Sequence, residues 1–161
     1  MKAVVVYESL WGNTAQVAAA IAEGIGPDAQ ALSTTEATAG ALADVELIVA
    51  GAPLLGFQLP TEQMRATIAA SPGNGPTRPD ISHPPLRSWL DTLPEGHGRA
   101  AAFETRIWWS PGSATKTILG SLEKAGYVPA GKGQRFIVKG KYGPLRDGEI
   151  ERARQWGTQF A

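Results

Sequence analysis

A short polar loop near the start of the chain carries residue types that bind an anion. It lies between an apolar run and a segment of helical periodicity, where unpaired backbone N–H groups and the positive end of a helix meet. The loop reads Ser9-Leu10-Trp11-Gly12-Asn13-Thr14. Its hydroxyl and amide side chains are donors to phosphate oxygens, and Gly12 lets the backbone close around them.

The loop differs from the common nucleotide-binding loops. It has no Lys or Arg, so it lacks the ending of a P-loop, and it lacks the glycine spacing of a dinucleotide turn. This composition favours a monoester phosphate held by neutral donors. The alternative is a polar turn in which Asn13 or Thr14 only caps the helix.

The elements that position this loop alternate along the chain. Strands are predicted at residues 2–7, 29–33, 47–50, 99–104 and 135–138, and helical segments at 17–25, 38–42, 61–70, 85–93, 113–126 and 147–160. Short apolar strands alternating with helices predict a parallel sheet covered on both faces, a three-layer α/β sandwich. Residues 71–80 are too rich in Pro and Gly for a regular element. We interpret them as an excursion, either a surface insertion or a substrate lid, within one domain of residues 1–161.

The composition excludes several classes of function. With no Cys among 161 residues, there is no disulfide, thiolate metal site or thiol nucleophile. His83 and His97 are expected in solvent-facing loops without further ligands, so no metal site is predicted. No apolar run approaches the roughly 18 residues of a membrane span, and no signal peptide is evident, so a cytoplasmic protein is expected. Basic residues near the C-terminus alternate with acids as on a solvated helix, which argues against a nucleic-acid partner.

Two separated motifs resemble the flavodoxin family. Residues 7–14 (Tyr-Glu-Ser-Leu-Trp-Gly-Asn-Thr) and 143–149 (Gly-Pro-Leu-Arg-Asp-Gly-Glu) are similar to motifs of small bacterial flavodoxin-domain proteins. In that family the first loop holds the FMN phosphate. The resemblance therefore implies FMN as cofactor and a five-stranded parallel sheet of order 2-1-3-4-5 with helices on both faces. It also implies a flavin beyond the carboxyl ends of the strands.

The resemblance also implies two loops that flank the flavin ring. Residues 53–58 form an apolar loop in which Phe57 is a candidate stacker, and residues 105–112 contain Trp108 and Trp109, only one of which can cover the ring. Arg106 is expected either to stabilise reduced flavin or a substrate anion, or to pair with an acid such as Glu104. The implied cofactor-binding residues are Ser9, Leu10, Trp11, Gly12, Asn13, Thr14, Pro53, Leu54, Leu55, Gly56, Phe57, Thr105, Arg106, Trp108 and Trp109.

The other two tryptophans are predicted to pack. Trp89 and Trp156 lie on amphipathic segments and are expected in helix-to-sheet contacts. No catalytic acid or base is predicted, because a bound flavin performs the redox chemistry itself.

The expected function is electron transfer by an FMN-binding protein, with the flavin nucleotide and a redox partner protein as its partners. An electron carrier is favoured over a dedicated oxidoreductase. The alternatives are a flavin-dependent quinone or protoporphyrinogen-type reductase, a flavin-storage protein, or a cofactor-free interaction module. The zero net charge departs from the acidic character of many flavodoxin carriers. The lack of a Thr-His pair after Pro53, expected in the resembling branch, favours the non-enzymatic alternatives.

Overall fold

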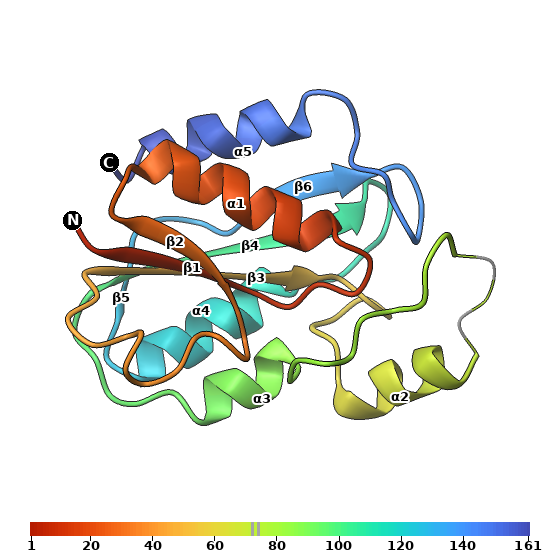
Figure 1. Cartoon of the computed structure of the whole chain (residues 1–161), viewed down its shortest axis with the longest axis horizontal. Coiled ribbons are helices and arrows are strands. Elements are labelled where there is room, and N and C mark those ends of the chain that lie inside the picture. Colours follow the sequence, from red (N-terminus) through yellow and green to blue (C-terminus); the bar gives the residue numbers. More distant parts are fainter. Residues whose placement is uncertain (72, 74) are drawn as a thin grey trace.

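Strands and helices follow one another along the chain, but the alternation is less regular than predicted (Figure 1). The predicted helical segment at residues 38–42 is wrong, because none of the described residues between the second and third strands forms a helix. The computed structural model describes residues 1–71, 73 and 75–161; Pro72 and Asn74, within the predicted excursion, lie outside the described residues. The strands are β1 (Ala3–Tyr7), β2 (Ala29–Ser33), β3 (Leu47–Pro53), β4 (Arg99–Ile107), β5 (Val128–Pro129) and β6 (Gln134–Val138). The helices are α1 (Asn13–Ile25), α2 (Glu62–Ala70), α3 (Leu86–Asp91), α4 (Thr115–Lys124) and α5 (Glu149–Thr158).

All strand pairs of the sheet are parallel, in the order β2-β1-β3-β4-β5. The predicted order is confirmed, but the last position holds two strands. Residues 99–100 of β4 pair with β5, whereas residues 103–107 pair with β6. β5 and β6 therefore follow one another beside β4. The last strand predicted from the sequence, at residues 135–138, lies within β6, whereas the short strand β5 was not predicted.

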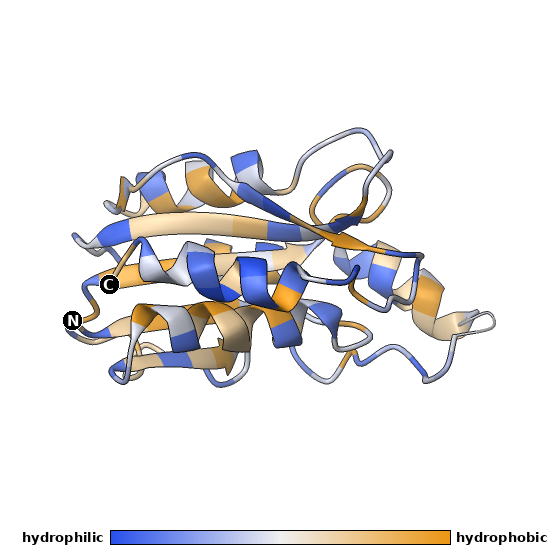
Figure 2. Cartoon of the chain, turned by 90° about the horizontal axis from the view of Figure 1, so that it is seen from above, coloured by the Kyte–Doolittle hydropathy of each residue, from blue (hydrophilic) through white to orange (hydrophobic). Residues whose placement is uncertain are grey.

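Two apolar cores lie on the two faces of the sheet. Successive side chains of a strand point to opposite faces, so Val4 and Val6 pack toward α3 and α4, while Val5 packs toward α1 and α5. Figure 1 shows these helix pairs on opposite sides of the strands. In Figure 2 the strands are predominantly apolar, and the helices mix apolar and hydrophilic residues. The predicted three-layer sandwich is confirmed.

Trp89 and Trp156 are buried in these cores, as predicted. Trp89 also donates its indole N–H to the Ala37 carbonyl at 2.9 Å, so its polar atom is satisfied. On the other face, α1 and α5 approach closely, because a Cβ atom on Gly24 would lie 2.0 Å from the Arg154 carbonyl oxygen.

The connections around β3 determine what lies at the carboxyl end of the sheet. The connection from β2 to β3 contains only turns, among them one closed by a hydrogen bond from the Leu42 N–H to the Thr38 carbonyl. The connection from β3 to β4 contains both α2 and α3. Figure 1 shows α2 beyond the carboxyl ends of the strands, and its one buried residue is Arg65. Within the described residues, no helix is long and apolar enough to cross a membrane.

Candidate functional site

The loop between β1 and α1 is organised by Ser9. Its hydroxyl oxygen accepts hydrogen bonds from the N–H groups of Gly12 at 3.1 Å and Ala15 at 3.2 Å. Gly12 precedes α1 with a φ of 92°, a conformation that residues with a Cβ atom seldom adopt. Among the hydrogen bonds of the described residues, none is donated by the N–H of Asn13 or Thr14. These first two N–H groups of α1 are therefore available to an anion.

The side chains of Asn13 and Thr14 have roles that the sequence did not predict. The Asn13 amide donates to the Tyr142 carbonyl at 3.1 Å, and the Thr14 and Thr105 hydroxyls share a hydrogen bond of 2.8 Å. A Cβ atom on Gly143 would lie 2.4 Å from the Asn13 amide oxygen. Asn13 thus connects the motif at residues 7–14 to the segment that leads into the motif at residues 143–149, and its expected role as a donor to an anion stays a prediction.

A cavity of about 270 Å³ opens beside this loop, at the carboxyl ends of β1, β3, β4 and β6. It combines the first loop with the segments after β3 and β4, as the resemblance implies. Its wall contains Ser9, Leu10, Trp11, Asn13, Thr14, Pro53, Leu54, Leu55, Gly56, Thr105, Arg106, Ile107, Ser110, Val138 and Lys141. The wall is mainly apolar, and its polar side chains come both from the loop of residues 9–14 and from the segments around Thr105 and Lys141.

Four of the candidate residues are not on this wall. They are Gly12 and the three aromatic residues Phe57, Trp108 and Trp109, which are 57%, 73% and 63% exposed. The loops that carry these three aromatic residues contact one another, because a Cβ atom on Gly112 would lie 2.0 Å from the Phe57 carbonyl oxygen. The structure places the three rings outside the cavity, so stacking on a ring inside it stays a prediction.

Trp11 is the tryptophan that borders the cavity. Its ring packs edge-on against Tyr142, with centroids 5.0 Å apart and planes at 79°. The buried indole N–H of Trp11 has no hydrogen-bond partner within the described residues. A donor left in this state favours a polar ligand nearby.

The two cations of the cavity wall come from different parts of the chain. Arg106 is buried, pairs with buried Glu104 at 2.9 Å and donates to the Gly112 carbonyl at 3.0 Å. Of the two expectations for Arg106, pairing with Glu104 is observed, although the pair is buried and not solvated. Lys141 was missed by the sequence reasoning, together with Ile107, Ser110 and Val138. The nearby Gly-Pro-Leu motif was the available signal, but it gave no indication that Lys141 would reach the first loop.

Comparison with known structures shows which fold the chain has. No family model matches the chain, and no curated protein matches its sequence. A flavodoxin from the domain Archaea aligns with 100% of this chain and 96% of its own, at 22% identity and a TM-score of 0.68. Flavodoxin 1 from Bacillus cereus aligns with 99% of this chain and 97% of its own, at 19% identity and a TM-score of 0.67. The chain has the flavodoxin-like fold.

A larger protein of known structure contains the same fold. A flavodiiron core from Synechocystis aligns with 100% of this chain but with 35% of its own chain, at 21% identity and a TM-score of 0.64. The flavodoxin-like fold therefore also occurs as one part of a longer chain. At these identities the comparisons establish the architecture, and the site must be argued from its own residues.

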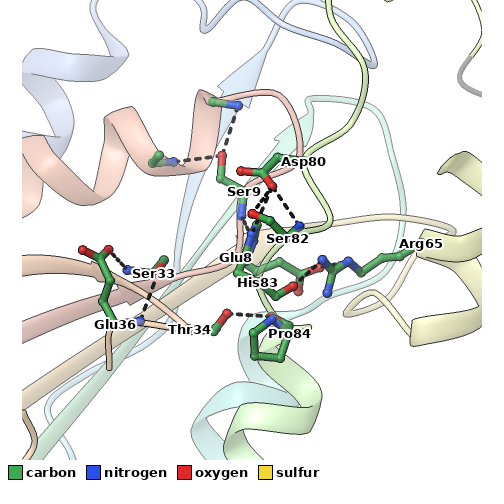
Figure 3. Close-up of polar contacts among 12 residues, drawn as sticks. Glu8, Ser9, Ser33, Thr34, Glu36, Arg65, Asp80, Ser82, His83 and Pro84 are labelled. Atoms are coloured by element: carbon green, nitrogen blue, oxygen red, sulfur yellow. Dashed lines mark hydrogen bonds and ion pairs between the residues drawn. The ribbon is translucent and has the colours of Figure 1, made fainter. Parts of the chain in front are cut away.

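One feature of this flavodoxin-like fold contradicts the sequence-based expectation. His83 was expected to face solvent, but it is 6% exposed, and its Nε2 accepts a hydrogen bond from the Ser9 N–H at 3.1 Å. The chain after α2 folds back over the end of β1 and buries this side chain. His97 is exposed, as expected. Figure 3 shows His83, Asp80 and Ser82 gathered beside Ser9, with Arg65 extending toward them from α2.

A buried carboxylate lies below the same loop. Glu8 accepts a hydrogen bond from the Leu86 N–H at 2.9 Å, and its second oxygen lies 3.6 Å from the Arg65 Nε. Within the described residues that second oxygen has no hydrogen-bond partner. Burial raises the pKa of Glu8 to about 7, although the Leu86 N–H, Arg65 and Arg87 act in the opposite direction.

Proposed function

We propose that the protein binds FMN in the cavity beside the loop of residues 9–14 and acts in electron transfer. The observation that carries this proposal is the position of the N–H groups of Asn13 and Thr14, which donate to no acceptor among the residues that the structure describes. These groups lie at the N-terminus of α1, where a phosphate is stabilised, and both residues border the apolar cavity. The resemblance of the first loop to that of flavodoxins supports the same ligand.

The chemistry of the wall fits a flavin nucleotide. Leu54, Leu55 and Val138 present apolar side chains suited to a flat ring, while the donors of the first loop are suited to a phosphate. The buried Nε atoms of Trp11 and Arg106 have no partner within the described residues and provide further donors. Lys141 adds a positive charge at the wall. This charge balances the negative charge of a phosphate, which neutral donors cannot do.

When bound, FMN supplies the redox chemistry, and the protein tunes it through charge and exclusion of water. The chain's own groups would hold the phosphate at the α1 N-terminus and orient the ring between the segments after β3 and β4. Arg106, held by Glu104 at 2.9 Å, would keep a fixed positive charge at the wall. A fixed positive charge stabilises added negative charge, and therefore favours the reduced flavin.

Three further statements belong to this proposal. We propose that residues 1–161 act as one domain, that the protein works in the cytoplasm, and that electrons pass to or from a partner protein. The exposed Trp108 and Trp109 beside the cavity support a partner surface, because adjacent exposed apolar side chains favour contact with another molecule.

An FMN titration of the purified protein, followed by quenching of flavin fluorescence, tests the proposal. Riboflavin and FAD serve as comparisons. We expect FMN to bind at least about tenfold more tightly than riboflavin, because hydrogen bonds to a charged group contribute about 1.5 to 3 kcal/mol each. Absence of binding by all three flavins would overturn the redox function. Equal affinity for FMN and riboflavin would overturn the phosphate site.

The variant Gly12→Val sharpens this test. A β-branched residue is strained at a φ of 92°, so the N–H groups of Asn13 and Thr14 move and FMN affinity falls to the riboflavin level. Gly148→Val is the matched control, since Gly148 precedes α5 with a φ of 85° and is not on the cavity wall. The control should lose similar stability and keep its preference for FMN.

A further inference from the structure

We propose that residues 80–83 form a brace that positions the phosphate loop, and that this brace holds only while the His83 imidazole is neutral. The brace makes binding of a phosphorylated flavin dependent on pH, whereas binding of the unphosphorylated flavin stays unaffected. This inference rests on the proposed FMN function, and it concerns a positioning role.

Two hydrogen bonds of opposite direction connect the brace to the loop. The Ser9 N–H donates to the His83 Nε2 at 3.1 Å, and the Asp80 N–H donates to the Leu10 carbonyl at 2.8 Å. Adjacent residues of the loop are thus held by two residues of one distant segment. Because Ser9 also accepts the Gly12 and Ala15 N–H groups, a shift of Ser9 would move the whole N-terminal turn of α1.

The imidazole of His83 is held in one orientation (Figure 3). Its Nδ1 lies 3.7 Å from an Asp80 carboxylate oxygen, and the same oxygen accepts from the Ser82 N–H at 2.9 Å and hydroxyl at 2.6 Å. Arg65 donates to the His83 carbonyl at 2.5 Å and anchors its backbone. This arrangement assigns the ring proton to Nδ1 and leaves Nε2 as the acceptor for the Ser9 N–H.

Protonation of His83 would break the contact with Ser9. A protonated imidazole carries hydrogen on both nitrogens, so Nε2 would no longer accept, and two N–H groups would face each other. A second cavity of about 440 Å³ has His83, Asp80 and Ser9 on its wall, which gives solvent protons a route to the ring. Acidification would therefore release Ser9 from the brace.

The charges around His83 set the direction of this dependence. Burial lowers the pKa of His83, Arg65 from α2 lowers it further, and Asp80 raises it. Tyr7 and Glu36 line the second cavity, and Glu8 at the end of β1 faces Arg65. The net effect keeps the ring neutral at pH 7, so the brace is intact there and is lost as the pH falls below 6.5, the ordinary pKa of His.

The experiment compares FMN and riboflavin affinities between pH 5 and 8 in the wild type, His83→Gln and His83→Leu. The Gln amide oxygen can accept the Ser9 N–H at any pH, whereas Leu cannot accept it. We expect the ratio of FMN to riboflavin affinity to fall more steeply with acid in the wild type than in His83→Gln. His83→Leu should show a ratio about tenfold lower at pH 8, as one lost hydrogen bond implies. The phosphate of FMN also titrates near pH 6, but it does so equally in all three proteins.

A second measurement makes the brace testable without flavin. In the flavin-free protein, the ¹⁵N–¹H resonance of Ser9 should follow the ionisation of His83 in the wild type and be independent of pH in His83→Gln. Asp80→Asn should move the midpoint to lower pH, because it removes the charge that favours protonation. A Ser9 resonance whose position does not change as His83 ionises would overturn the proposal of a brace. A resonance that follows His83 in a protein that binds no flavin would support the brace and overturn the proposed function alone.

Discussion

Glu8 and Glu104 are two fully buried glutamates at the carboxyl end of the sheet, but their surroundings differ. Glu104 on β4 contacts Arg106 at 2.9 Å and accepts hydrogen bonds from the N–H groups of Ala114 and Thr115 at 3.1 and 3.2 Å. Glu8, just after β1, has one N–H donor at 2.9 Å and an arginine nitrogen at 3.6 Å. Both oxygens of Glu104 therefore accept hydrogen bonds, whereas one oxygen of Glu8 accepts none from the part of the chain that the structure describes.

The difference shows that burial alone does not determine the state of a carboxylate. A carboxylate with complete hydrogen bonding is kept in its charged form, whereas one with an unpaired oxygen is more easily protonated. Through its hydrogen bonds, Glu104 holds Arg106 and the beginning of α4 in place. Glu8 is suited to exchange a proton near neutral pH, because burial raises its pKa to about 7.

The largest loss of stability should come from breaking the ion pair of Glu104 and Arg106. Replacement of Arg106 by Met leaves Glu104 buried without its counter-charge, which typically costs about 3 to 5 kcal/mol of unfolding free energy. Urea denaturation at pH 7 measures this loss. The double variant Glu104→Gln/Arg106→Met is the control and should recover part of it, because no unpaired charge remains. A loss below about 1 kcal/mol for the single variant would contradict the comparison.

The second effect concerns the pair of Glu8 and Arg65, which should make the stability of the protein depend on pH. The folded-state pKa of Glu8 is raised from 4.5 to about 7, so the folded protein holds an extra proton between these values. The resulting stabilisation is complete below pH 4.5 and is lost as the pH rises through 7. Glu8→Gln stays neutral, so its stability relative to the wild type should increase by up to about 3 kcal/mol between pH 4.5 and 8. Urea midpoints across this range measure the difference, and a constant difference would show that Glu8 does not titrate there.

The smallest effect should come from the helix that supplies Arg65. Thr61 accepts a hydrogen bond from the Met64 N–H at 3.1 Å and caps α2, so Thr61→Ala should cost about 1 kcal/mol. Thr67→Ala in the same helix is the matched control, since Thr67 is exposed and its hydroxyl donates to the Gln63 carbonyl without capping the helix. Thermal unfolding should separate the two variants. Equal melting temperatures would show that the cap does not stabilise α2.

Local sequence patterns predicted the framework because the periods of strands and helices act over a few residues. Alternating apolar runs were sufficient for a parallel sheet with two covered faces. The spacing of Glu104 and Arg106 places both on the same side of a strand, which allows them to pair. The first loop was recognisable because Gly12 and its neighbours must precede a helix. The strand β5 was not predicted, since its two residues, Val128 and Pro129, are too few to show a strand period.

The tertiary structure alone decided which distant residues complete the site. His83 contacts Ser9 across 74 positions, and Asn13 contacts Tyr142 across 129. Lys141 lies on the cavity wall, while Trp108 and Trp109 lie outside it. These positions also depend on how segments far apart in the sequence are arranged in space. Such contacts depend on the path of irregular segments, whose backbone has no period from which a side chain's direction could be predicted. The sequence by itself therefore determined the sheet, its helices and the first loop, and the folding of the irregular segments over the strand ends determined what surrounds that loop.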